Sequence, residues 1–251
     1  MSLAHQLDRW YGNVRALHEP RPSRRLRVDS NRFLCGRLSR PQMVERLVRA
    51  RRGLLAATGE PIYVESNNFL HGFLGVLDDV FGEPFVLHVV RDPRTYIRSW
   101  INFGVYTGLK GLVGRVHPYW LLKPERLAPA GPLRWNQMHP YVRIGWYWTA
   151  INRHLDRGAD LFGPRYLRLR FEDLFSPQGN GLERFLQWFG LEPNEQMSHA
   201  LTDQKVNRSS RNECPAWSQW PQDVRDEVLR QCGPLMETYG YDLDKPPGGK
   251  S

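Results

Sequence analysis

Cysteine is scarce in this sequence. Its 251 residues include only three, Cys35, Cys214 and Cys232, and these lie far apart. An odd number at such spacings excludes both the disulfide framework of a small secreted protein and the paired cysteines of a zinc site. We therefore expect three buried or inert thiols and no bound metal.

Long hydrophobic runs are missing as well. The longest, such as Pro84–Val90, fall far short of the roughly 20 residues that a membrane-spanning helix needs. Asp8 and Arg9 interrupt the N-terminal segment before it forms the apolar stretch of an export signal. The sequence predicts no membrane span and a soluble protein of the cytoplasm.

One stretch of the chain has many arginines and few acidic residues. The chain has 35 Lys and Arg against 26 Asp and Glu, a net charge of +9, and Arg21–Arg52 alone has eleven arginines against Asp29 and Glu45. This surplus favours a phosphate-bearing partner, because the guanidinium fork matches phosphate geometry. A solvated helix face in an arginine-rich sequence explains it equally well. Signatures of DNA- and RNA-binding modules are absent, so we do not expect a nucleic-acid partner.

Short apolar runs alternate with segments of helical spacing along the chain. The apolar runs predict strands at Val14–Leu17, Ile62–Val64, Pro84–Val90 and Tyr166–Phe171. The helical spacing predicts helices at Leu3–Trp10, Pro41–Leu55, Phe69–Phe81, Thr95–Phe103, Tyr141–Leu155, Gly181–Phe189 and Asp223–Tyr239. This alternation predicts an α/β fold, in which helices cover both faces of one parallel sheet.

No repeat and no linker divides the chain, so we expect a single domain over residues 1–245. Residues 104–140 are rich in Gly, Pro and aromatics and predict an irregular insertion or lid. Residues 246–251 end in Gly-Gly-Lys-Ser, which imitates half of a Walker motif. No helix comes after it to direct its amides at a phosphate, so we expect a disordered tail.

The most informative segment runs from Phe85 to Ser99. A buried strand delivers Arg91 at its carboxyl end, which is where open α/β sheets bind ligands. Pro93 comes next at a position suited to the first turn of a helix, and Ser99 lies about two turns along it. This spacing allows Arg91 to supply charge, and Ser99 a hydroxyl, to one phosphate group. An ordinary strand-to-helix turn, whose arginine pairs with a surface acid, is the alternative.

An Arg-Asp-Pro strand end with a serine eight residues after the arginine resembles the sulfotransferases that use 3′-phosphoadenosine 5′-phosphosulfate. Other segments come in the order of that family: the aromatic-Glu-Asp-Leu of Phe171–Leu174, the helix ending at Phe189-Gly190-Leu191, and the basic Lys205–Ser210 with the tryptophans after it. The resemblance implies a three-layer α/β/α fold related to P-loop NTPases. It also implies that Arg91 and Ser99 hold the 3′-phosphate of the donor, and that Lys205 and Arg208 contact its nucleotide.

The strand and Gly-rich loop that open this family, and that cradle the 5′-phosphosulfate, have no counterpart here. Leu3–Trp10 and the turn His18-Glu19-Pro20 match the segments that come after the loop in the family, so Met1 falls about where the loop should end. The missing strand lies in the middle of the sheet in related folds, and its neighbours would lack ladder partners. Either the start was assigned too far downstream, which we favour, or the chain has lost donor binding.

Sulfuryl transfer needs positioned charge and a base that takes the proton of the acceptor hydroxyl. Relatives place the base near the strand before the Arg-Asp-Pro strand, and the matching residues here are Val64–His71. Glu65, at the end of the strand, is our first candidate and His71 the second. Helix capping by Ser66, Asn67 or Asn68 is as good an interpretation of this segment. The turn at His18 and Glu19 lines the acceptor side or is purely structural. Glu172 organises the site or is a structural carboxylate.

The resemblance therefore implies transfer of a sulfuryl group to a hydroxyl of a carbohydrate or small metabolite. We expect residues 104–140, with Trp120, Lys123 and Trp135, to bind the acceptor. The sequence indicates neither which acceptor nor which oligomeric state. The alternative is a non-catalytic nucleotide- or polyanion-binding protein on the same scaffold, supported by the missing loop and the basic stretch. A nucleotide kinase is disfavoured, because the Walker lysine is absent.

Overall fold

The computed structural model describes residues 3–104, 108–176, 179–202 and 214–245. They form two compact units. The first comprises Met1–Val86, Leu161–Leu167 and Asp173–Arg208, and the second comprises Leu87–Asp160, Arg168–Glu172 and Ser209–Ser251. Within the described part of the chain, no helix combines the length and the apolar character that crossing a membrane requires.

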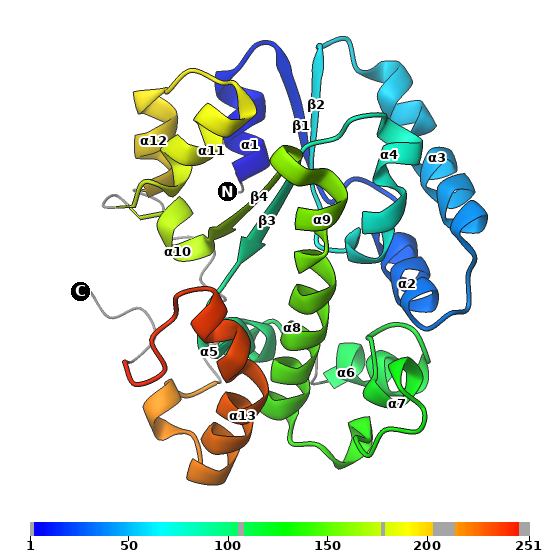
Figure 1. Cartoon of the computed structure of the whole chain (residues 1–251), viewed down its shortest axis with the longest axis vertical. Coiled ribbons are helices and arrows are strands. Elements are labelled where there is room, and N and C mark those ends of the chain that lie inside the picture. Colours follow the sequence, from blue (N-terminus) through cyan, green and yellow to red (C-terminus); the bar gives the residue numbers. More distant parts are fainter. Residues whose placement is uncertain (1–2, 105–107, 177–178, 203–213, 246–251) are drawn as a thin grey trace. The chain divides into compact units, whose positions relative to one another are not determined.

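The first unit contains a pair of parallel strands and the helices around it (Figure 1). The elements are α1 Leu3–Trp10, β1 Val14–His18, α2 Ser23–Leu34, α3 Arg40–Ala57, β2 Ile62–Ser66, the 3₁₀ helix η1 His71–Val76, α4 Leu77–Phe81, α11 Gly181–Phe189 and α12 Glu195–Thr202. Strands β1 and β2 pair residue by residue from Val14 with Ile62 to His18 with Ser66. Both strands therefore end at the same edge, where ligands bind in parallel sheets.

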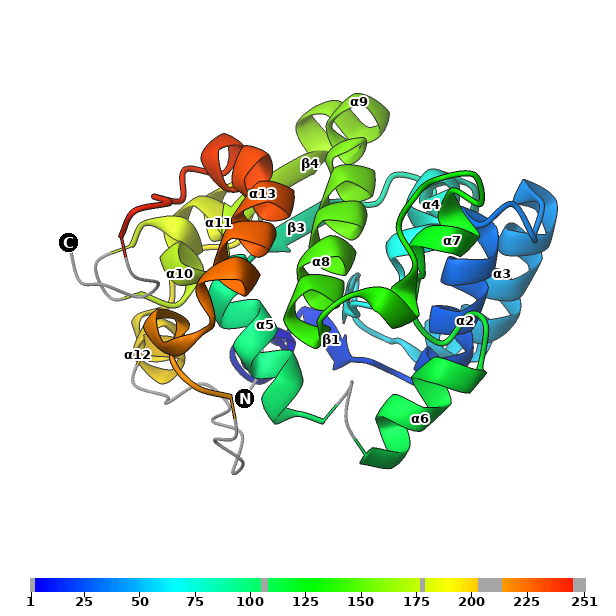
Figure 2. The same cartoon turned by 90° about the horizontal axis from the view of Figure 1, so that it is seen from below.

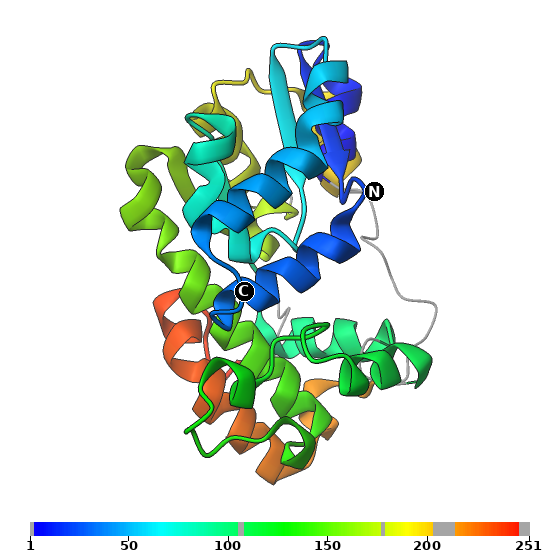
Figure 3. The ribbon, with the colours of Figure 1, turned by 90° about the vertical axis from the view of Figure 1, so that its right-hand side faces the viewer.

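Helices α2 and α3, two of the blue helices in Figure 3, pack on η1 around a small apolar core. Its buried side chains are Leu26, Leu38, Met43, Leu47, Phe73 and Val76. The approach of η1 to α2 is close: a Cβ on Gly72 would lie 2.5 Å from the Cα of Ser30. A side chain at position 72 does not fit without moving the backbone of α2.

Gly72→Ala is expected to destabilise the protein by about 1–3 kcal/mol, because overpacking forces a backbone shift. Gly75, on the same 3₁₀ helix, has no atom within 4 Å of its would-be Cβ, so Gly75→Ala is the matched control. Urea unfolding monitored by tryptophan fluorescence compares the two. Equal midpoints for both variants would contradict the close approach.

The second unit is built around the long helix α8, along which α5 and α13 lie (Figure 2). Wholly or partly in this unit are β3 Val86–Val90, α5 Pro93–Asn102, α6 Gly108–Val116, α7 Pro124–Leu127, η2 Trp135–Gln137, α8 Pro140–Asp156, α9 Gly158–Phe162, β4 Tyr166–Arg170, α10 Phe171–Leu174, η4 Trp217–Gln219 and α13 Gln222–Thr238. The short helix η3 Gly163–Arg165 precedes β4.

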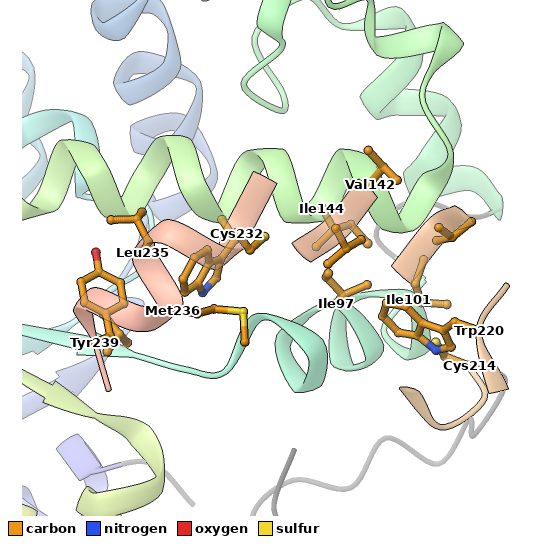
Figure 4. Packing of buried hydrophobic residues seen from close by; sticks show 14 residues of the cluster. Ile97, Ile101, Val142, Ile144, Cys214, Trp220, Cys232, Leu235, Met236 and Tyr239 are labelled. Carbon is orange, nitrogen blue, oxygen red and sulfur yellow. The ribbon is translucent and has the colours of Figure 1, made fainter. Parts of the chain in front are cut away.

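Apolar side chains of α5, α8 and α13 meet in the core of this unit (Figure 4). Ile97 of α5, Ile144 of α8 and Met236 of α13 are fully buried. The thiol of Cys232 is buried among them, and burial raises its pKa to about 12. Such a thiol is inert, as the sequence predicts for this residue.

The strands do not form the single sheet that we expected. The structure is mixed α/β, with helices dominant and short parallel strands, which confirms the coarse prediction. However, β1 pairs only with β2, and β3 only with β4, so the described residues contain two two-stranded sheets. Each pair thus has outer edges without a ladder partner among the described residues.

The insertion at residues 104–140 is more regular than predicted, since it contains α6 and α7. Glycines lowered the predicted helicity, but Gly114 is packed where a Cβ would lie 2.8 Å from the Cδ1 of Leu121. Trp135 is 1% exposed and Lys123 is buried, with its Nζ donating to the carbonyl of Arg115. These two side chains therefore hold the insertion together rather than facing an acceptor.

Candidate functional site

The strand-to-helix turn at Arg91 has the local structure that the sequence predicts. Strand β3 ends at Val90, and α5 begins at Pro93 with Asp92 as its N-cap. The carboxylate of Asp92 accepts from the backbone N–H of Arg94 at 2.8 Å, which satisfies one amide of the first turn. The indole Nε1 of Trp148 donates to the carbonyl of Arg91 at 2.9 Å. The backbone of the turn is thereby fixed from two sides.

The side chain of Arg91 is held at one end only. Its Nε donates to the Oγ1 of Thr95 at 3.0 Å, and its guanidinium lies 4.8 Å from the ring centroid of Phe171. Its two terminal nitrogens have no hydrogen-bond or ion-pair partner among the described residues. Burial lowers the pKa of Arg91, and the carboxylates of Glu172 and Asp92 oppose that shift. A partly desolvated cation with free donors is suited to bind an anion.

Ser99 lies one turn beyond Thr95 on α5. Residues four apart share one face of a helix, so the two hydroxyls succeed each other along the same side. The Oγ1 of Thr95 accepts from Arg91 and donates to the carbonyl of Asp92 at 3.0 Å. The Oγ of Ser99 has no partner among the residues that the structure describes. Arg91, just before α5, and Ser99, about two turns along it, thus both have donors without a partner among the described residues.

The aromatic-Glu-Asp-Leu segment contacts this turn. Besides the stacking of Phe171, Glu172 accepts from the backbone N–H of Asp92 at 3.1 Å and from the hydroxyl of Tyr241 at 2.8 Å. Burial and the neighbouring Glu172 raise the pKa of Tyr241, so its hydroxyl keeps its proton and donates it. Glu172 therefore helps to organise the Arg91 turn through structural hydrogen bonds.

Glu65, the first candidate base, is part of a buried ion pair in the other unit. The Nε and Nη2 of Arg51 each donate to it at 2.6 Å, and both side chains are buried. The hydroxyl of Tyr63 and the Nδ2 of Asn67 donate at 2.9 and 2.7 Å. Four donors occupy the lone-pair sites of the carboxylate. A substrate hydroxyl would have to displace one of them.

His71, the second candidate, is 4% exposed at the start of η1. Its Nδ1 lies 3.1 Å from the carbonyl of Asn68, and its Nε2 lies 3.1 Å from the Oδ1 of Asn31. Both ring nitrogens are therefore engaged. Glu65 and His71 belong to the first unit, whereas Arg91 and Ser99 belong to the second.

Lys205 and Arg208 lie outside the described residues, and so does the rest of the basic segment around them. The first described residue after this gap is Cys214, which α5 holds by its backbone. Asn102 accepts from the N–H of Cys214 at 2.8 Å, and the Nε of Arg98 donates to its carbonyl at 3.1 Å. The chain thus returns to the helix that carries Ser99.

A second group of polar residues lies at the carboxyl edge of β1 and β2. The Nδ1 of His18 is 3.4 Å from the Oγ of Ser66, and the N–H of Glu19 donates to the carbonyl of Ser66 at 2.9 Å. Glu19 has a φ of 45°, a left-handed conformation that is uncommon for any residue with a side chain. Strain of this kind concentrates at functional sites. His18 is exposed there.

The basic stretch is partly neutralised within the first unit. At least four of its eleven arginines have acidic partners: Arg40 with Asp79, Arg46 with Asp29, Arg49 with Glu45, and Arg51 with Glu65. Two of these acids lie within the stretch and two come from β2 and α4. The positive surplus available to a polyanion is therefore smaller than the sequence suggests.

Comparison with known proteins found no matching family model, no similar curated protein and no similar solved structure. The assignment of a function therefore depends on the geometry of the site and on the sequence motifs.

Proposed function

We propose that this protein is a sulfotransferase with a P-loop NTPase-like fold. Its donor is 3′-phosphoadenosine 5′-phosphosulfate, and its acceptor is a hydroxyl of a carbohydrate or small metabolite. The proposal is supported by the resemblance of the Arg-Asp-Pro segment to that family and by the geometry of the Arg91 turn.

A single observation carries the proposal: Arg91 forms no ion pair with an acid of the described residues. Thr95 and Phe171 fix its guanidinium, yet its terminal nitrogens have no partner in the same part of the chain. A structural arginine at the end of a strand would be expected to pair with an acid, as the neighbouring Arg94 does with Asp92 at 2.7 Å. An arginine held in place but left unpaired, with a serine hydroxyl further along the helix, favours binding of a phosphate.

In the proposed reaction the acceptor oxygen forms a bond to the donor sulfur. The bond between that sulfur and the bridging phosphate oxygen breaks, and adenosine 3′,5′-bisphosphate leaves with the electron pair. The proton of the acceptor hydroxyl goes to a base, and the products are a sulfate ester and the bisphosphate. Glu65 and His71 remain the candidates for this base, and Lys205 and Arg208 the further contacts of the nucleotide. Metal ions have no part in this proposal.

Arg91→Ala is expected to weaken the binding of adenosine 3′,5′-bisphosphate by at least about tenfold, or about 1.4 kcal/mol. The reason is that the variant loses the donors that face the 3′-phosphate. Isothermal titration calorimetry measures the affinity, and adenosine 5′-phosphate serves as the ligand without that group. Arg230→Ala is the control, because Arg230 is exposed and pairs with Glu227 on the surface of α13. An unchanged affinity in Arg91→Ala would rule out the site.

The non-catalytic polyanion-binding alternative predicts a different salt dependence. A polyanion binder loses affinity steeply with salt and without regard to the position of the phosphate. A donor site prefers the 3′-phosphate over plain adenosine 5′-phosphate at every salt concentration. Repeating the titrations at two salt concentrations separates the two functions.

A further inference from the structure

The chain that comes after α13 returns to the Arg91 turn. Its contacts are centred on Arg94, which is 3% exposed. The guanidinium of Arg94 donates to the carbonyls of Asp242 at 3.0 Å, Leu243 at 3.3 Å and Lys245 at 2.7 Å. Three carbonyls of one short segment thus converge on a single buried side chain.

A turn within residues 242–245 directs their carbonyls toward Arg94. The carboxylate of Asp242 accepts from the backbone N–H groups of Asp244 and Lys245 at 3.0 and 3.2 Å. This Asx-type turn curves the chain so that its carbonyls point to one side. The contacts that form this turn lie within residues 242–245, and the group that their carbonyls bind is the guanidinium of Arg94.

The same segment holds Asp92 from both directions. The Nη2 of Arg94 donates to the Asp92 carboxylate at 2.7 Å. On the other side, the hydroxyl of Tyr241 donates to Glu172, which accepts from the N–H of Asp92. Asp92 comes directly after Arg91 and caps α5. Residues 241–245 therefore help to fix the backbone at Asp92, and this backbone sets the direction of the Arg91 side chain.

Arg91 itself makes one side-chain hydrogen bond within the described part of the chain, to Thr95. The direction of its free nitrogens therefore depends on the backbone of the turn as well as on the contacts with Thr95 and Phe171. Small displacements of a binding group weaken the interaction strongly, because hydrogen bonds to phosphate are directional. Residues that fix this backbone therefore also orient the donor groups of Arg91.

We propose that Arg94 and Tyr241 are positioning residues of the 3′-phosphate site, through which residues 241–245 hold the Arg91 turn. This inference rests on the proposed function. Neither side chain is required to touch the nucleotide. Their effect is expected on the preference for the 3′-phosphate and not on the affinity for the rest of the ligand.

Tyr241→Phe tests the proposal with the ring and its packing retained. The ratio of the affinities for adenosine 3′,5′-bisphosphate and adenosine 5′-phosphate is expected to fall by about fivefold, the effect of one hydrogen bond. Affinity for adenosine 5′-phosphate alone is expected to stay unchanged. Arg94→Lys is the second variant: lysine keeps the charge beside Asp92 but does not reach three carbonyls at once, and the same loss is expected.

Tyr239→Phe is the matched control. Its hydroxyl donates to the carboxylate of Asp156 at 2.7 Å. Tyr239 is close to Tyr241 in the sequence but takes part in a different hydrogen-bond network. An equal loss of the ratio in Tyr239→Phe and Tyr241→Phe would mean a general effect on the fold and would overturn the inference. A wild-type ratio in Tyr241→Phe and Arg94→Lys, with the ratio lost in Arg91→Ala, would also overturn it and leave the proposed function intact. Equal affinities of the unmodified protein for both nucleotides would overturn both.

Discussion

Glu65→Gln is expected to lower the free energy of unfolding by about 3–5 kcal/mol, because it leaves a buried charge without its partner. The side chain of Arg51 is 0% exposed and that of Glu65 7%. Two short hydrogen bonds join them, and Tyr63 and Asn67 complete the shell of the carboxylate. An amide of the same shape accepts fewer of these donors and carries no charge. Urea unfolding at neutral pH measures the loss.

Two further variants make this expectation specific. Glu45→Gln breaks the pair with Arg49 on the exposed face of α3, and surface pairs contribute little, so no measurable change is expected. Replacing both partners, as Arg51→Met with Glu65→Leu, is expected to recover much of the lost stability, since apolar pairs of similar volume often replace buried ion pairs without loss. Wild-type stability of Glu65→Gln would contradict the buried pair.

The same variant tests whether Glu65 serves as the base or only stabilises the fold. A loss of turnover in Glu65→Gln counts as evidence for a base only if the folded fraction is unchanged under the assay conditions. The four donors on the carboxylate lead us to expect that stability falls first. Under that outcome the second candidate, His71, is tested next, and the exposed His18 beside Ser66 after it.

The sequence was sufficient to predict the Arg91 turn because every signal for it is local. An apolar strand, an N-capping Asp92, Pro93 in the first helical turn and a serine two turns later all lie within fifteen residues, from Phe85 to Ser99. The N-cap bond of Asp92 and the bond of Arg91 to Thr95 are local as well and need no long-range pairing. The contacts of Arg91 with Phe171 come from a separate segment and were beyond such reasoning.

The buried ion pair of Glu65 was not predicted, because its partner lies on another element. Nothing in the composition marks which of eleven arginines is buried. The spacing on α3 does contain a signal: Met43, Leu47 and Arg51 are four residues apart, and they are the buried residues of that helix. An arginine at the end of an apolar stripe shares its face and is buried with it. The stripe therefore predicts that Arg51 needs a buried acid.

Helix α2 was not predicted for a related reason. Six of its residues are buried, but most of them are polar: Ser23, Leu26, Arg27, Asp29, Ser30 and Asn31. The buried face has no apolar stripe to detect. Its hydrogen bonds run to residues far along the chain, such as Ser30 to the carbonyl of Phe69 and Asn31 to His71. Patterns of hydrophobicity cannot reveal a helix that is held mainly by polar contacts.

Acidification is expected to destabilise the protein through His88, by about 3 kcal/mol between pH 6.5 and pH 4. His88 lies on β3, 3% exposed, with its Nε2 2.8 Å from the Oδ1 of Asn152. Burial lowers its pKa from 6.5 to about 4, against the opposing effects of Asn152 and Asp156, while Arg168 adds to the shift. The neutral imidazole is therefore the form that the fold accommodates.

The direction of the effect comes from the two protonation states. Above pH 6.5 the ring is neutral in both the folded and the unfolded chain, and this residue contributes no pH dependence. Between pH 6.5 and about 4 the unfolded chain binds a proton that the folded chain does not, so the free energy of unfolding falls as the pH falls. Below about pH 4 both states are protonated and the loss is complete.

His88→Gln isolates this contribution from those of the carboxylates. Glutamine retains a donor for the Oδ1 of Asn152 but does not titrate, so the variant is expected to lose less stability than the wild type between pH 7 and pH 4. His18→Gln, at an exposed position, is the control for replacing a histidine outside the core. Urea unfolding curves at intervals of half a pH unit give the difference. Parallel profiles for the wild type and His88→Gln would mean that His88 accepts its proton in the folded state, and that β3 tolerates a charge three residues before Arg91.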